Sequence, residues 1–427
     1  MKLCLHLTAL LLLSLTLPLR AQKPVYFNIV SHNEITDSLD YANSMADFKY
    51  IRNQVKELCD SIISKKARYN MQVDANFIFG ALRYDNAADN PIDILEWASQ
   101  SPYIAVDGHN HFDQFANPYN YADLAYLLDS CGVKLEHNIL GGITYATMTV
   151  GGLHLIENWT QYSKPKAGYT FTKFLWEADI IWGTATPGHV ADYTTFGVWK
   201  PAGGDSPEEF GTHDPDQTLT AIGGGCKNDV GYNLNPKDHR LFHTTDQVIT
   251  NILHIVDSIQ LSADSPNDFY TMNMLINFRD IPYIPSFADS ISKIIDGLQA
   301  YVDEGKIIWA TLGEKYDRWY ALHSNPEDYF NVDCSAIPVG MQEEVVTEET
   351  SFYPNPTQGK LYAPSSIRQK GPFEALLYDP AGHLLRQVSV PNGSIDLSGL
   401  PGGIYFLQIL QNKHIYHQHI FKIGAHL

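Results

Sequence analysis

Short apolar runs alternate with amphipathic helical segments through most of this chain. Residues 25–30 and 306–312 have the composition of buried strands, whereas residues 48–66 and 245–261 repeat their apolar positions at helical spacing. Strands that alternate with helices are typical of βα units, in which the strands run parallel. The alternation therefore predicts an α/β fold with a parallel barrel or sheet over residues 22–335.

The chain from Ser351 to Leu427 predicts a second domain of a different class. Pro354 and Pro356 favour an extended, turn-prone start, because proline fixes φ and lacks an amide donor. The Asp379–Gly382 turn lies between two apolar runs and predicts a hairpin. A second turn at residues 400–403 leads into the apolar run Ile404–Leu407, which reads as a buried strand. We expect a small all-β sandwich over residues 351–427.

The same segment carries four motifs in a fixed order: "YPNPTQG", "YDPAG", "IDLSGLPGGIYFL" and a closing "KI". In this order they resemble the type A sorting domain of the Bacteroidetes type IX secretion system. The resemblance implies an address label that engages the type IX secretion machinery, carries the protein across the outer membrane and is usually cleaved. Residues 336–350, which include "QEEVVTEET", are expected to form an acidic linker before it.

The N-terminus is consistent with export. Met1 and Lys2 form a short positive region, Leu3–Leu19 is apolar, and Ala21 offers a small residue at a cleavage site. This pattern predicts a signal peptide over residues 1–21. No second long apolar run follows, so we expect no transmembrane anchor and a location in the medium or on the outer-membrane cell surface.

The charge of the chain argues against two classes of partner, whereas its cysteines leave open whether disulfides form. The formal net charge is −19, and the acidic residues are concentrated before the tail. An acidic body argues against nucleic acid and against anionic membrane surfaces as partners. Four cysteines follow the predicted signal peptide, in a compartment where either disulfides or free thiols are possible. They are Cys59, Cys131, Cys226 and Cys334.

Two polar clusters directly follow expected strands. The first contains His32 and Glu34, and the second is "DGHNHFD", residues 107–113, after a strand at 103–106. In parallel barrels the carboxyl ends of the strands share one face and build the site. Imidazoles and carboxylates there are ligands for zinc and similar divalent ions. The pattern predicts a divalent metal cofactor, zinc first. The expected metal ligands are His32, His109, His111 and Asp113.

The order of these segments resembles the polysaccharide deacetylase superfamily, a distorted (β/α)7 barrel shared with certain glycoside hydrolases. "VSHNE" stands where that family has a "TFDD"-like motif, and "DANFIFG" stands at its second strand. "DGHNHFD" stands at its metal motif, and "IIWATLGE" at a late strand. The resemblance implies a metal-dependent hydrolase acting on carbohydrate. The paired aspartates are absent, and the HxxxH spacing becomes His109 to Asp113, which puts deacetylation in question.

Under this interpretation Glu34 and Asp113 are the candidate catalytic carboxylates, with Glu34 as general base or metal-side carboxylate. His189, Tyr193 and Trp199 are candidates for contact with a glycan substrate.

Two alternatives remain open. The HxH of "DGHNHFD" is also similar to the motif of metal-dependent amidohydrolases, although there it ends the first barrel strand. The chain could instead be a non-catalytic glycan-binding or surface protein on the same barrel, which the missing aspartate pair favours. Metal analysis of the purified protein separates a metal hydrolase from the non-catalytic protein.

Overall fold

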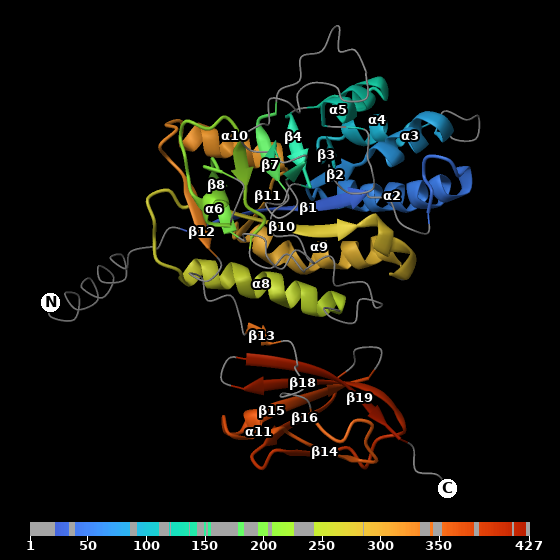
Figure 1. Cartoon of the computed structure of the whole chain (residues 1–427), viewed down its shortest axis with the longest axis vertical. Helices are drawn as coiled ribbons and strands as arrows, with labels where there is room; N and C mark the ends of the chain where they lie inside the picture. The colour runs from blue at the N-terminus through green and yellow to red at the C-terminus, as the bar shows by residue number, and fades with distance from the viewer. Residues whose placement is uncertain are drawn as a thin grey trace, which may run out of the picture. The chain divides into compact units, whose positions relative to one another are not determined.

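The computed structural model divides into two compact units, Met1–Pro338 and Val339–Leu427. Figure 1 shows their elements. The structure describes residues 22–33, 39–85, 92–110, 119, 121–135, 137–142, 149–150, 153–154, 178–182, 195–203, 207–225, 243–284, 286–333, 342–344, 352–379, 384–411 and 414–423.

The first sheet of the N-terminal unit is built around β1 (Val25–Asn33). Strand β10 (Tyr270–Asn277) pairs with β1 along most of its length. The early residues of β1 also pair with β11 (Ile307–Trp309) and the later ones with β2 (Tyr69–Val73). Strand β3 (Ile104–Gly108) follows β2, and every pair in this sheet is parallel. The sheet is the parallel α/β arrangement that the alternation predicted.

A second sheet has the order β12-β8-β9-β7-β4. Its β4 (Ile139–Gly141), β7 (Ile180–Trp182) and β9 (Thr220–Ile222) are parallel. Its β8 (Thr195–Trp199) and β12 (Phe330–Asp333) join by antiparallel pairing.

The two sheets are in contact along their facing edges, including through backbone pairing. A parallel bridge joins His109 to Gly141, and the Asn273 amide donates to the Gly224 carbonyl at 3.0 Å. The described strands thus form a parallel half-barrel and a mixed sheet in contact with it.

Side-chain caps fix where several of the helices begin. Ser44 caps α2 (Met45–Lys65), whose inward residues include Ile51 and Val55 at the predicted spacing. Thr244 and Thr311 form capping boxes at the starts of α8 (Thr245–Leu261) and α10 (Leu312–Leu322). Figure 1 shows α8 and α9 on one side of the sheet and α4 and α5 beside β3. The remaining helical segments are α3 (Ala75–Tyr84), α4 (Ile94–Ser99), α5 (Tyr121–Ser130), α6 (Pro207–Gly211), η3 (Phe278–Tyr283) and α9 (Phe287–Asp303).

One expected strand is a helix. The motif "DANFIFG" was assigned to the second strand, but β2 ends at Val73 and α3 begins at Ala75. The cause is Asp74, whose carboxylate accepts a hydrogen bond from the Phe77 amide and caps the helix. An apolar run of this length does not by itself distinguish a strand from a buried helix.

The C-terminal unit is all-β. Its larger sheet places β18 (Gly403–Gln411) between β15 (Phe373–Tyr378) and β19 (His414–Lys422). Consecutive strands β15 and β16 (Leu384–Val390) pair antiparallel, as the predicted hairpin requires. Residues 342–344, inside the segment expected to be a linker, form β13 and pair with β19. A small second sheet and one short helix complete the unit: β14 (Lys360–Tyr362), β17 (Ser394–Asp396) and α11 (Ser365–Arg368).

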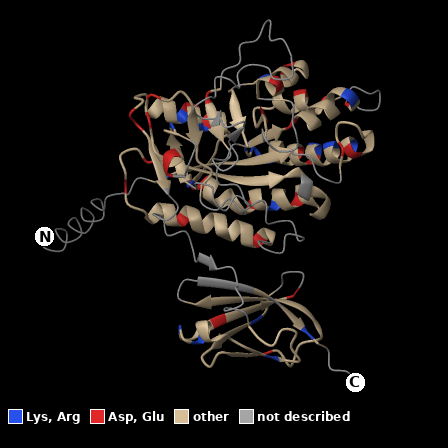
Figure 2. Ribbon diagram, viewed as in Figure 1, with Lys and Arg blue, Asp and Glu red and all other residues tan. Residues whose placement is uncertain are grey.

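Charged residues lie mainly on helices and loops, whereas the central strands carry few (Figure 2). Strands β1, β2, β7 and β10 contain no Lys, Arg, Asp or Glu. Cys59 and Cys131 are buried free thiols; Cys226 and Cys334 lie outside the described residues. No helix within the described ranges is both long and apolar enough to cross a bilayer. The predicted signal peptide, residues 1–21, also lies outside those ranges.

Candidate functional site

Two of the predicted site residues meet in the interior of the N-terminal unit. His32 is the penultimate residue of β1, and His109 directly follows β3. Their ring centroids are 3.9 Å apart with planes tilted by 36°. The two side chains are only 3% and 1% exposed. Parallel strands bring their carboxyl ends to one edge, and this places the two imidazoles together.

Uncharged polar and aromatic side chains surround this pair. Trp182, the last residue of β7, makes an edge contact with His32 at 5.5 Å between ring centroids. Its indole Nε1 donates to Oδ1 of Asn273 at 3.2 Å, which fixes the indole against β10. Asn277 at the end of β10 is the register partner of His32 and is buried. Four strands therefore contribute to one interior cluster.

Two consecutive glycines make room for this cluster. A Cβ at Gly141 would lie 2.6 Å from the side-chain amide of Gln72, and a Cβ at Gly142 would overlap the His109 ring. Gly142 also has φ +81°, a conformation that other residues rarely adopt. The end of β4 is therefore shaped around Gln72 and His109.

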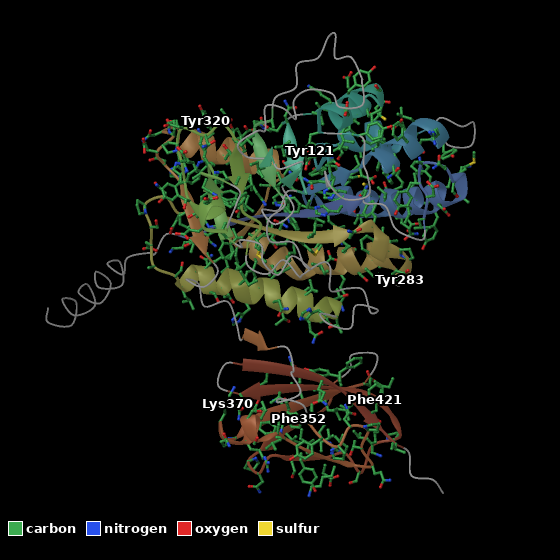
Figure 3. The ribbon with its side chains drawn as sticks, in the orientation of Figure 1. Tyr121, Tyr283, Tyr320, Phe352, Lys370 and Phe421 are labelled. Atoms are coloured by element: carbon green, nitrogen blue, oxygen red, sulfur yellow. The ribbon has the colours of Figure 1, made fainter. Side chains whose placement is uncertain are left out.

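Tyr121 holds the residues that follow His109 close to β4. Its phenol oxygen lies 2.6 Å from the Gly141 carbonyl oxygen and 2.9 Å from that of Asn110. The ring is buried at the start of α5, where Figure 3 labels it. A hydroxyl that bonds both carbonyls fixes the position from which the chain continues after His109.

A polar chain lies behind the histidines, toward the amino ends of the strands. The Lys315 ammonium donates to Asn28 Oδ1 at 2.5 Å, and Asn28 donates to Asn70 Oδ1 at 2.8 Å. Asn70 in turn donates to Asp107 Oδ2 at 2.6 Å. Complete burial holds the pKa of Lys315 well below its usual range, because desolvation disfavours the charged form. This chain ties β1, β2, β3 and α10 together below the site.

Five of the other predicted site residues lie outside the described residues. They are Glu34, His111, Asp113, His189 and Tyr193.

Trp199 is a core residue of β8. It is 1% exposed, and its Nε1 donates to the Phe210 carbonyl at 2.6 Å. Its ring also packs edge-on against Phe210. Because the indole has no exposed face for a sugar, we do not include it in the proposed site.

Gln72, Asn273, Trp182 and Tyr121 were not anticipated as site residues. One signal was available: β1 and β2 are fully buried, yet each carries polar residues at alternate positions, Asn28 and His32 or Asn70 and Gln72. Alternate residues of a strand face the same side. Polar alternation in a buried strand therefore indicates a polar interior.

The donor set suits a metal ion only in part within the described ranges. His32 and His109 supply two buried imidazoles, a ligand type that zinc accepts. No group of three His, Cys, Asp or Glu residues that could hold an ion occurs there. The further predicted ligands, His111 and Asp113, follow His109 within four residues of sequence and lie outside those ranges.

A comparison with protein families decides the identity of the tail. Residues 351–422 match the family described as the secretion system C-terminal sorting domain. Residues 351–422 are a secretion sorting domain. This agrees with the type IX motifs in the sequence and assigns the protein to secretion and the cell surface, with the type IX machinery as a partner of the sorting domain.

Similarity elsewhere in the chain is remote. No curated protein matches. A solved structure from Parabacteroides distasonis, assigned as a glycoside hydrolase/deacetylase, aligns with 96% of this chain and 88% of its own at 9% identity and a TM-score of 0.44. The 4-alpha-glucanotransferase from Thermococcus litoralis aligns at 11% identity and a TM-score of 0.40, over 70% of this chain and 40% of its own. Neither likeness decides the chemistry of the site.

Proposed function

We propose that the N-terminal unit is a secreted, metal-dependent hydrolase that acts on carbohydrate and resembles a deacetylase. The observation that carries the proposal is the buried pair His32 and His109, in contact at the carboxyl ends of two parallel strands. The contacts between the two sheets at Gly141 and Gly224 support a distorted (β/α)7 barrel as the complete fold.

In this proposal His32 and His109, with His111 and Asp113, hold a divalent ion, zinc first. A bound zinc ion polarises a scissile carbonyl and lowers the pKa of a coordinated water. Glu34, which directly follows β1, acts as the general base. Asp113 is the second catalytic carboxylate, and His189 and Tyr193 contact the glycan.

The described residues supply the setting for this chemistry. Trp182, held by Asn273, closes one side of His32, and the buried interior excludes bulk water. Tyr121 fixes the chain beyond His109 through the Asn110 and Gly141 carbonyls. Preorganised groups of this kind need no rearrangement when the substrate binds.

The test is metal content, measured on protein purified without chelators. Wild type is expected to hold about one divalent ion per chain, and His32→Ala with His109→Ala is expected to lose it. The loss should be nearly complete, because a zinc site binds with on the order of 10 kcal/mol or more and two of about four ligands are removed. The exposed His254 on α8 provides a matched control, His254→Ala, which should keep the ion.

An ion-free wild type, or a double variant with full occupancy, contradicts the metal proposal. The second candidate is a non-catalytic glycan-binding surface protein, which the absence of the paired aspartates favours. Wild-type protein that binds oligosaccharides, holds no ion and releases no product would support that candidate.

A further inference from the structure

Gln72 is a fully buried amide whose hydrogen-bonding capacity is not used within the described residues. Neither Nε2 nor Oε1 has a hydrogen-bond partner there, although the residue is 0% exposed. Asn70, two positions earlier on the same face of β2, shows the contrast. It accepts from Asn28 Nδ2 and the Leu312 amide and donates to Asp107. Buried amides normally have such partners, so an unused one requires an explanation.

The position of Gln72 ties it to the two histidines. Its side-chain amide lies against Gly141, while the His109 ring lies against the adjacent Gly142. His32 is its register partner on β1. Nearby, Asn273 has its Oδ1 bonded to Trp182, whereas its Nδ2 has no partner among the described residues. Unused amide groups from β2 and β10 thus belong to the interior that holds the histidine pair.

We propose that Gln72 is a ligand-binding residue of this site and that its ligand is a neutral sugar. A primary amide offers one acceptor and one donor group, which match two neighbouring sugar hydroxyls, each able to donate and accept. Trp182, Asn273 and Asn277 on the neighbouring strands carry no charge. The carboxylate of Asp107, the register partner of Gln72 on β3, already accepts a hydrogen bond from Asn70, so an uncharged ligand is favoured. This inference rests on the proposed function, because Gln72 would bind two hydroxyls of the carbohydrate substrate in the same site.

The ligand-binding role and a purely structural role predict opposite effects on stability. If Gln72 served the fold, replacing it would remove useful bonds and destabilise the protein. If its amide is reserved for a ligand, Gln72→Met keeps the length of the side chain and removes two unpaired polar groups. An apolar replacement of similar shape is then neutral or stabilising in the free protein.

The first measurement is thermal unfolding of the free full-length protein. Gln72→Met is expected to melt at or above the wild-type temperature, whereas Asn70→Leu, which breaks three hydrogen bonds on the same face, should melt clearly lower. A Gln72→Met protein that melts as low as Asn70→Leu overturns the inference. That outcome would assign Gln72 to the fold, for example through a resident water.

The second measurement is calorimetric titration with neutral tetrasaccharides of glucose, xylose and mannose. Wild type should bind at least one of them, and Gln72→Met should bind it about tenfold more weakly or worse, because two hydrogen bonds to the ligand are lost. His254→Ala should bind as wild type does. Where turnover is measurable, the Gln72→Met effect should fall on KM more than on kcat. Unchanged affinity in Gln72→Met, or no binding by wild type, overturns the inference.

The two proposals fail in different ways. A wild type that binds a sugar through Gln72 but holds no ion refutes the hydrolase and leaves the inference standing. An ion-loaded wild type that hydrolyses a glycan with the same KM in Gln72→Met refutes the inference alone. Gln72→Met should retain the ion in either case, because no carboxylate or imidazole is altered.

Discussion

The two units of this protein have different interiors. The core of the sorting domain is apolar and includes Phe352, Leu377, Leu407 and Ile420. The interior of the N-terminal unit buries many amides, imidazoles and charged groups. These include Asn28, His32, Asn70, Gln72, Asp107, His109, Asn273 and Lys315.

This difference in the two interiors indicates which unit binds a ligand inside. Burying polar groups costs free energy unless they are paired, so an apolar core is the simpler route to stability. The N-terminal unit retains a polar interior in which some groups are fully bonded and Gln72 is not. Its interior is therefore where a ligand is expected. In the described part of the sorting domain the buried polar residues are Thr357, Gln411 and Lys422, and the Gln411 amide donates to the Ile367 and Gly371 carbonyls and so serves the fold. On its surface Ile404 and Phe421, the latter labelled in Figure 3, form an exposed cross-strand pair.

The largest expected effect comes from deleting the C-terminal unit. Deleting Val339–Leu427, the whole C-terminal unit, should abolish delivery to the cell surface and the medium and leave the protein in the periplasm of its host. The N-terminal unit should still fold, because it has its own core. Cell fractionation with immunodetection measures the location, and thermal unfolding of the purified truncation checks the fold. Surface delivery of the truncated protein would contradict the assignment.

The polar interior gives the next largest effect. Asn28→Leu removes one acceptor of Lys315 Nζ and one donor to Asn70, whose remaining bonds are to the Met272 carbonyl and the Leu312 amide. We expect the free energy of unfolding to fall by about 1–3 kcal/mol, since two buried hydrogen bonds worth about 0.5–1.5 kcal/mol each are lost. Urea unfolding followed by circular dichroism measures it. Asn251→Leu, at an exposed position of α8, is the control and should change stability little.

A stability loss as small as that of Asn251→Leu would show that the chain of polar contacts is replaceable. The buried polar groups of the N-terminal unit would then contribute little to the free energy of unfolding, and the difference between the two interiors would not reflect stability.

The sequence predicted what depends on local pattern. The tail combines two-residue alternation with proline and glycine turns, so its strands, hairpin and identity could all be predicted. The alternation of strands and helices predicted the parallel sheet, and the rule that strand ends converge placed His32 beside His109. The local pattern misled at Asp74, where a single capping carboxylate decides between a helix and a strand.

The rest depends on contacts between residues far apart in the sequence. Gln72 lies against Gly141, and Trp182 bonds Asn273, at separations that no local pattern encodes. The antiparallel pairing of β8 with β12 joins residues 195–199 to residues 330–333 and could not be predicted either. Local signals therefore located the edge of the sheet that carries the site but not the side chains that complete it.

The smallest expected effect concerns a charged cluster at the amino ends of the strands. Nδ1 of His137 lies 3.0 Å from Oδ2 of Asp179, and its Nε2 lies 3.3 Å from Oδ1 of Asp317 on α10. The hydrogen bond and charge of Asp179, aided by Asp317, raise the pKa of His137 to about 9, against the opposing effect of burial. Gly313 allows this close approach, because a Cβ there would lie 2.5 Å from the imidazole.

A raised pKa means that the folded protein keeps a proton which the unfolded chain releases near pH 6.5. The stabilisation is fully present below that pH and is lost as the pH rises toward about 9. We expect a loss on the order of 1–2 kcal/mol across this window, a reduced value because Asp317 is 66% exposed and screened by solvent. Urea unfolding of wild type and His137→Gln at pH 6 and pH 9 measures it. The two proteins should differ at pH 6 and converge at pH 9. A constant difference at both values would mean that His137 acts through packing against Tyr316 rather than through its charge.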